Sequence, residues 1–444
     1  MKKKYNYALI LLSIGLVFLG CATHWAKDRN FISSSIEKKT GSKPGPESKG
    51  LFFQLPANVL INDGIDEDEA VAIALWNNAQ FQADLLQLGI ARADLITAGM
   101  IKNPAFSLLF PIGPKQLEWS LNLPAELIWQ RPNRVSMAKL NVEMVAENLV
   151  QNGLGLVRDV LMGYAGLVQA EQQAEIYEEE VKLQDEIVTI AESRLKVGDI
   201  SEVEATAIHL EAARTKENLI RSANETELRL LSLKQLLGLI LEDTEISLSP
   251  AEYQTDKEMS LDSLLATAYA TRPDLRAAEL SIEAAGKRLG WERSKIFMLT
   301  AVLDANAEGK EGYEMGPGLQ TEIPLFNWNQ GGRSRADAQL EQASKLYLAK
   351  KQQIALQVRT AYSNYTASRH ILALLKNVTI SNAQKASENA EKAYMLGDIS
   401  YLELLEFRRQ LLNARLREVE ADANLKRTQA ELLFSIGFDP WSVK

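Results

Sequence analysis

Two copies of one short stretch, Val197-Gly198-Asp199-Ile200-Ser201 and Leu396-Gly397-Asp398-Ile399-Ser400, decide how the 444 residues are organised. Their glycines are 199 residues apart, and Arg134 precedes Arg333 by the same interval. A fixed internal period reveals architecture, because each repeat is one structural unit. We therefore predict two structural repeats, residues 66–245 and 246–444.

Long helices are predicted on both sides of each stretch. From about residues 136 and 334 to the glycine turns there is no proline, and roughly 60 residues in a helix would give a rod of roughly 90 Å. Return helices over about residues 201–237 and 400–433 are rich in strong helix formers. Apolar residues at helical spacing favour packing between antiparallel rods over a cofactor site.

The segment before each rod predicts a β-hairpin, at about residues 105–124 and 298–325. In the second hairpin one face carries Leu299, Ala301, Leu303, Ala305 and Ala307. Thr300, Asp304 and Asn306 alternate with them and Val302 is the exception, so the periodicity is that of a strand. About ten residues is the length that a tilted membrane strand needs. A soluble hairpin packed on helices is the alternative.

Four strands do not close a barrel, and lipid tolerates no open sheet edge. Three chains would contribute twelve strands to one barrel. Trp119, Trp129 and Trp328 would then lie in interfacial aromatic belts.

The amino terminus predicts export. Three lysines and an apolar run too short to span a bilayer indicate a signal peptide over residues 1–20. Phe18-Leu19-Gly20-Cys21 resembles the bacterial lipobox, in which the cysteine is lipidated, and an ordinary signal peptide is the alternative. Cys21 is the only cysteine, so a disulfide within the chain is excluded. Residues 21–65 are polar and predict a lipid-anchored, flexible tether.

Charge and motifs argue against several functions. The net charge of −9, or −12 without the three lysines of the signal peptide, disfavours nucleic acid. The sequence has no Gly-x-x-x-x-Gly-Lys-[Ser/Thr] phosphate loop and no nucleophile motif, so we expect no enzyme and no cofactor. His24, His209 and His370 are isolated and predict no metal site.

The repeated helix, hairpin, long helix, glycine turn and helix resemble the TolC family of outer-membrane efflux proteins, over about residues 66–437. Within that span, residues 323–331 (Ile-Pro-Leu-Phe-Asn-Trp-Asn-Gln-Gly) are similar to the cobalt-zinc-cadmium efflux branch. The counterpart ending at Arg134 departs from the Gly-Lys-Arg of that branch. Metal ions and other small molecules therefore both stay open as the exported substrate.

The resemblance implies a mainly α fold with a small β part. It also implies a homotrimer with a 12-strand β-barrel in the cell outer membrane and an α-helical tunnel through the periplasm. Such a protein is the passive exit duct of a tripartite efflux system, with a periplasmic adaptor protein, an inner-membrane pump and outer-membrane lipid as partners. The alternative is a lipid-anchored periplasmic coiled-coil scaffold or adaptor protein.

Two sites follow from the resemblance. The residues of the two repeated stretches match the tips at which adaptors dock. Glu403 and Glu406, three residues apart on one helical face, match an acidic ring at the tunnel entrance, where they would attract cations. A chain-reversing turn and ordinary solvated helix charges are the simpler interpretations.

Overall fold

The computed structural model describes residues 27–46, 53–57, 59, 61, 64–110, 117–125, 127–249, 260–308 and 312–438. The predicted signal peptide and Cys21 lie outside the described residues.

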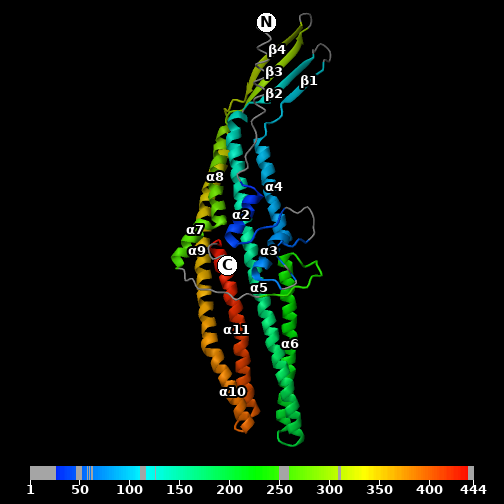
Figure 1. Cartoon of the computed structure of the whole chain (residues 1–444). Coiled ribbons are helices and arrows are strands. Elements are labelled where there is room, and N and C mark those ends of the chain that lie inside the picture. Colours follow the sequence, from blue (N-terminus) through cyan, green and yellow to red (C-terminus); the bar gives the residue numbers. More distant parts are fainter. Residues whose placement is uncertain are drawn as a thin grey trace. The chain divides into compact units, whose positions relative to one another are not determined.

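Each half of the chain contains helices, one β-hairpin and then further helices, in the same order (Figure 1). The first half contains α3 (Glu67–Asn77), α4 (Ala79–Gly99), β1 (Ala105–Leu109), β2 (Glu118–Pro124), α5 (Leu127–Lys196) and α6 (Glu202–Leu237). The second contains α7 (Leu261–Thr271), α8 (Pro273–Ser294), β3 (Leu299–Glu308), β4 (Gly312–Thr321), α9 (Gln330–Leu374), the π-helix η2 (Leu375–Thr379), α10 (Ile380–Leu396) and α11 (Tyr401–Ser435). The predicted mainly α fold with a small β part is confirmed. The repeat boundaries stay a prediction.

The described chain forms two compact units, each of which takes segments from both repeats. The first unit, Met1–Ile32, Asp84–Leu149 and Pro273–Lys351, contains the strands. The second, Ser33–Ala83, Val150–Arg272 and Gln352–Lys444, contains the glycine turns.

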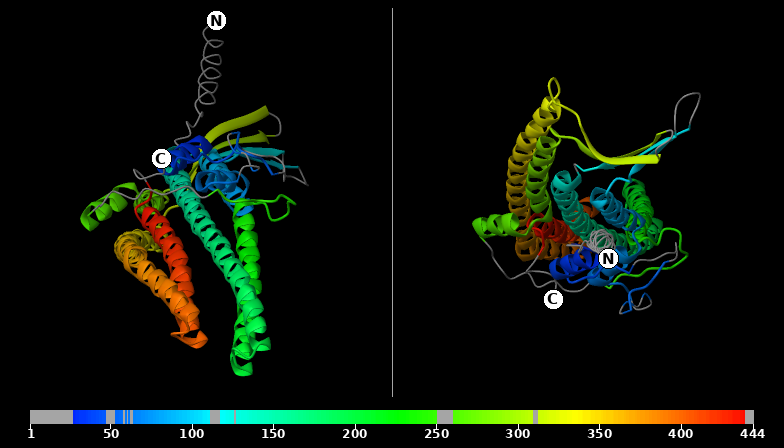
Figure 2. Two further views of the ribbon diagram at one scale, coloured as in Figure 1. Left: turned by 60° about the horizontal axis from the view of Figure 1, so that its bottom comes forward. Right: turned by 90° about the horizontal axis from the view of Figure 1, so that it is seen from above.

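All four strands form one antiparallel sheet in the order β1-β2-β3-β4, which the views of Figure 2 show as a curved sheet. The central pairing sets Trp119 opposite Ala305 and Leu121 opposite Leu303. Leu121 also pairs with Phe106 on its other side. Because directly opposed residues share a face, the predicted alternation gathers apolar side chains on one side of the sheet.

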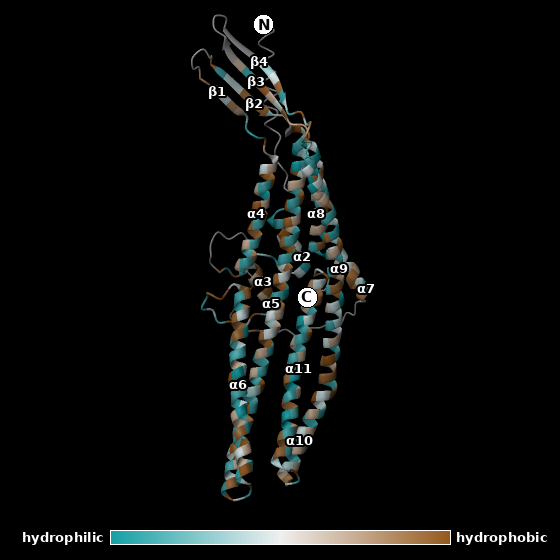
Figure 3. Ribbon diagram, turned by 180° about the vertical axis from the view of Figure 1, so that it is seen from behind, coloured by the Kyte–Doolittle hydropathy of each residue, from teal (hydrophilic) through white to brown (hydrophobic). Residues whose placement is uncertain are grey.

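Apolar stripes along the helices build the core of the second unit, and Figure 3 shows hydrophobic and hydrophilic residues alternating along α6 and α11. Tyr164 of α5 is fully buried, and its hydroxyl donates to the carbonyl oxygen of Ile65 at 2.9 Å. Ile354 and Val358 of α9 are also fully buried. The helical spacing in the sequence thus predicted packing residues. None of the helices in the described part of the chain combines the length and apolar character needed to cross a bilayer.

The helices differ from the prediction in four respects. α5 begins at Leu127 and not near residue 136, and Pro132, which has no N–H to donate, lies inside this helix. α9 begins at Gln330, after Asn329 with a positive φ of 59°. The rod expected to be continuous in the second repeat is interrupted by η2, and two helices instead of one precede each hairpin.

The expectation of a flexible tether over residues 21–65 was wrong for part of that range. Helix α2 (Arg29–Thr40) forms there, with Ile32 and Ile36 fully buried. A β-carbon built on Gly153 would lie 2.5 Å from Cδ1 of Ile36, so the glycine leaves the space that the isoleucine occupies. Lys39 donates to the carbonyl oxygen of Thr271 at 2.7 Å. Burial against distant segments orders this polar stretch.

Candidate functional site: the two helical tips

The first repeated stretch closes α5 and opens α6. Gly198 has a φ of 78°, and its N–H donates to the carbonyl oxygen of Leu195 at 3.0 Å. The N–H of Asp199 donates to the carbonyl oxygen of Arg194 at 2.9 Å. This pair of bonds satisfies carbonyls at the end of the helix, and a positive φ favours glycine.

The second stretch repeats this geometry at the end of α10. Gly397 has a φ of 80°, and its N–H donates to the carbonyl oxygen of Tyr394 at 3.1 Å. The N–H of Asp398 donates to the carbonyl oxygen of Ala393 at 2.9 Å. A β-carbon at Gly198 or Gly397 would meet no atom within 4 Å, so backbone conformation and not crowding explains each glycine.

Serine begins the helix after each turn, as expected. The Ser201 hydroxyl accepts from the N–H of Glu204 at 3.2 Å. The Ser400 hydroxyl accepts from the N–H of Glu403 at 3.3 Å, and the Glu403 carboxylate accepts from the N–H of Ser400 at 2.8 Å. The second turn therefore has a complete capping box, which fixes the start of α11.

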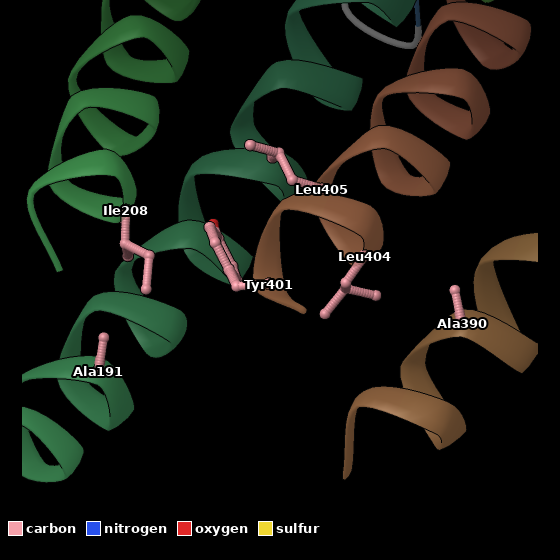
Figure 4. Close-up of a cluster of buried hydrophobic side chains, with 6 residues drawn as sticks. All are labelled: Ala191, Ile208, Ala390, Tyr401, Leu404 and Leu405. Carbon is pink, nitrogen blue, oxygen red and sulfur yellow. The ribbon is translucent and has the colours of Figure 1, made fainter. Parts of the chain in front are cut away.

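A small apolar core lies directly behind the two turns (Figure 4). Its buried members come from α5, α6, α10 and α11, and they are Ala191, Ile208, Ala390, Tyr401, Leu404 and Leu405. Ile200 and Ile399, the isoleucines of the repeated stretches, pack against this core. These two residues therefore anchor the turns, and a docking partner would meet other side chains.

Large apolar residues on the outside of the turns are exposed. Val197 is 80% exposed and Leu396 is 77% exposed. Met395, Val203 and Leu402 beside them are exposed as well. We call these five residues the tip patch. The sequence prediction included Val197 and Leu396 and missed the other three.

One polar contact joins the two turns. Arg194 donates from Nη1 to the Tyr394 hydroxyl at 2.8 Å and from Nε to the Asp199 carboxylate at 2.7 Å. Hydrogen bonding to Asp199 raises the pKa of Arg194, so the guanidinium stays charged. Its two partners lie 5 and 200 residues away in the sequence. Sequence reasoning missed Arg194 and Tyr394 because no local pattern links such distant residues.

The predicted acidic pair lies on the first turns of α11, and the two carboxylates make different contacts. Hydrogen bonds from the backbone and hydroxyl of Ser400 lower the pKa of Glu403. Glu406 accepts from the side-chain amide of Gln410 at 3.0 Å. Next along the helix, Arg409 pairs with Glu211 of α6. The structure thus gives Glu403 a capping role, and the entrance-gate role of both residues stays a prediction.

Two of the three histidines, His209 and His370, lie in the described part of the chain. His209 lies 3.8 Å from a carboxylate oxygen of Glu192, both on the exposed surface. Within the described part of the chain, no three His, Cys, Asp or Glu side chains gather closely enough to hold a metal ion.

Comparisons with known proteins show the family of the chain. Residues 73–239 and 264–438 match the family described as outer membrane efflux protein. The cobalt-zinc-cadmium resistance protein CzcC of Cupriavidus metallidurans is 23% identical over 357 residues, which cover 79% of this chain and 84% of that protein.

Solved structures share the fold. The outer-membrane channel OprN has a TM-score of 0.72 at 18% identity, and the match covers 84% of this chain and 90% of that one. CusC, described as forming a transmembrane channel, has a TM-score of 0.71 at 18% identity and coverages of 87% and 99%. The family match decides against the scaffold alternative. The chain belongs to the outer membrane efflux protein family, and it is an outer-membrane channel component of a tripartite efflux system.

Proposed function

We propose that the chain works as a homotrimer, anchored to the outer membrane by a lipid on Cys21, and that its tips dock a periplasmic adaptor. The adaptor would connect the trimer to an inner-membrane pump, which supplies the energy. The trimer itself would be a passive exit duct. The observation that carries this proposal is the tip patch, which exposes apolar side chains beside two turns of matching geometry.

The tips are suited to docking because they are preorganised. Two glycine caps, two serine caps and the buried core behind them fix the backbone, so little entropy is lost when a partner binds. Exposed apolar side chains on a rigid support can then pack against a partner, where fully desolvated residues contribute most of the binding energy.

Substitution of Gly397 separates docking from folding. Gly397→Asn keeps a residue that tolerates the left-handed conformation and adds a side chain where no atom lies within 4 Å. We expect the trimer level to stay unchanged while adaptor cross-linking and export are lost. Gly89→Asn on α4 is the matched control, because a β-carbon there also meets no atom within 4 Å. Normal export by Gly397→Asn would refute docking at this turn.

The acidic pair is proposed to form the tunnel entrance. Three copies of Glu403 and Glu406 would place six carboxylates near one axis, where they would attract cations and repel one another. We expect divalent cations added from the tunnel side to block single-channel currents. Glu406→Gln should weaken that block, and Glu391→Gln on α10 is the control. Unchanged block in trimers that carry both Glu403→Gln and Glu406→Gln would remove the gate from the proposal.

Metal ions are the substrate class that we propose. The support is the similarity to CzcC, whose name specifies cobalt, zinc and cadmium resistance, together with the sequence of residues 323–331. Export of these three ions from cells that express the chain with its cognate pump, compared with export of an organic drug, tests the proposal. Drug export without metal export would refute it.

A further inference from the structure

Four segments of the first unit meet where its helices join the strands. They are residues 98–104, 127–136, 286–298 and 322–337, which we call the junction collar. Trp129 donates from its indole nitrogen to the carbonyl oxygen of Ser294 at 3.2 Å. Arg134 donates to the carbonyl oxygen of Ala98 at 2.7 Å. Asn329 donates to the carbonyl oxygen of Glu292 at 2.8 Å. These bonds connect the four segments to one another.

The collar is basic although the whole chain is acidic. Its described residues include nine basic and three acidic ones, a local excess of six positive charges, whereas the net charge of the chain is −9. Glu292, one of the three acidic residues, is buried and accepts hydrogen bonds from Lys295 at 2.7 Å and Asn329 at 2.8 Å. This ion pair neutralises Lys295, so the positive excess comes from the other basic residues of the collar.

Several of the basic residues are exposed. They include Lys102, Lys287, Arg293 and Arg335. An excess of exposed positive charge attracts anions, so charge complementarity favours an anionic occupant for this surface.

Large apolar and aromatic residues accompany the charges. Phe326 is 91% exposed, and Leu325 beside it is 74% exposed. Arg333 stacks over Trp328 at 5.0 Å from the ring centroid, and Lys295 lies 3.8 Å from the centroid of Trp291. Aromatic rings with adjacent cations are enriched where protein crosses from lipid to water. An occupant that is both anionic and apolar fits this composition.

We propose that the junction collar binds the phosphate headgroups of anionic phospholipids, with Phe326 inserted among their acyl chains. The inference rests on the proposed function, because it requires the sheet to lie in the outer membrane. The collar then lies at the periplasm-facing leaflet, since it joins the sheet to the helices. Bound lipid would fix the depth of the sheet in the bilayer.

The test uses the purified full-length protein in vesicles of equal parts phosphatidylglycerol and phosphatidylcholine. Mass spectrometry measures which lipid the protein retains after mild detergent extraction. One variant combines Lys287→Gln, Arg293→Gln and Arg335→Gln. Its matched control combines Lys345→Gln, Lys385→Gln and Lys392→Gln, three exposed lysines outside the collar.

We expect the native protein and the control to enrich phosphatidylglycerol, and the collar variant to lose that enrichment. A basic residue near an anionic surface contributes about 1 kcal/mol, or about fivefold in affinity for each charge removed. The enrichment should also fall as salt rises, because exposed charges are screened. Phe326→Ser should weaken retention of both lipids alike.

Two results would overturn the inference. One is a native protein that retains both lipids equally, and the other is a collar variant that enriches phosphatidylglycerol as the control does. Conductance in pure phosphatidylcholine bilayers distinguishes the two proposals. A protein that conducts there without lipid preference refutes the collar alone, and a protein that neither conducts nor retains lipid refutes both.

Discussion

The bond between Arg194 and Tyr394 gives a quantitative prediction about the tips. Tyr394→Phe removes only the hydroxyl that accepts from Arg194 at 2.8 Å. A hydrogen bond to a charged group contributes about 1.5–3 kcal/mol. The Arg194 side chain is 35% exposed, so solvent screening reduces this value and we expect about 1 kcal/mol. That amounts to about fivefold in the equilibrium between turns joined by this bond and turns that have separated.

A double-mutant cycle isolates the bond. Arg194→Met also loses the contact with Asp199 and the stacking on the Tyr394 ring at 5.5 Å, so it should cost about 1 kcal/mol more than Tyr394→Phe. The double variant should cost less than the sum of the single variants, by about 1 kcal/mol. Arg415→Met, which removes the exposed pair with Glu179, is the control and should leave the tips unchanged.

Amide hydrogen exchange in peptides from the end of α10 and the start of α11 measures the opening free energy. Tyr394→Phe should speed exchange there about fivefold, and the conductance of the trimer should rise in the same variant. Strictly additive single variants, or unchanged exchange in Tyr394→Phe, would show that the bond does not hold the tips together.

Three further results are expected. Gly238→Ala should lower the free energy of thermal unfolding by several kcal/mol, because φ is 74° and a β-carbon would lie 2.3 Å from the carbonyl oxygen of Asn77. Gly198→Ala, where a β-carbon meets no atom within 4 Å, should lower it by about 1 kcal/mol. Equal losses in the two variants would contradict this reasoning. Ile36→Ala should cost about 2–5 kcal/mol in urea unfolding, because the side chain is fully buried, and a loss below about 1 kcal/mol would indicate that α2 does not stabilise the fold. The pKa of Glu403 is lowered in the folded protein, so its capping contribution to stability is present above the ordinary value of 4.5 and is lost as the pH falls below it. In Glu403→Gln, amide hydrogen exchange at the start of α11 should lose this pH dependence. A pH dependence that persists in the variant would assign it to another group.

Local patterns predicted the features that depend on local geometry. A positive φ favours glycine wherever it occurs, so the two repeated stretches predicted the two turns. Alternation with a period of two predicted both hairpins, and the pairing of Trp119 with Ala305 confirms the apolar face. The starts of α5 and α9 were predicted too late, since helix ends depend on caps and neighbours as well as on propensity.

Distant contacts explain the errors and omissions. The polar composition of residues 21–65 predicted a tether, but Ile36 packs where Gly153 leaves room, and this contact spans more than a hundred residues. One difference is local: the acidic residues were predicted as a pair, yet the capping box with Ser400 engages only Glu403. Composition alone gives no information about which segment a side chain will meet.

The sequence by itself determined the repeat, the two turns, the hairpins and the long helices, because each rests on backbone preferences and periodicity within one segment. Only the tertiary structure decided which segments meet. It placed β2 beside β3, Arg194 beside Tyr394, and the four segments of the junction collar together. Those contacts depend on the packing of the whole chain, since residues far apart in sequence become neighbours only when the apolar faces of their helices and strands are buried together.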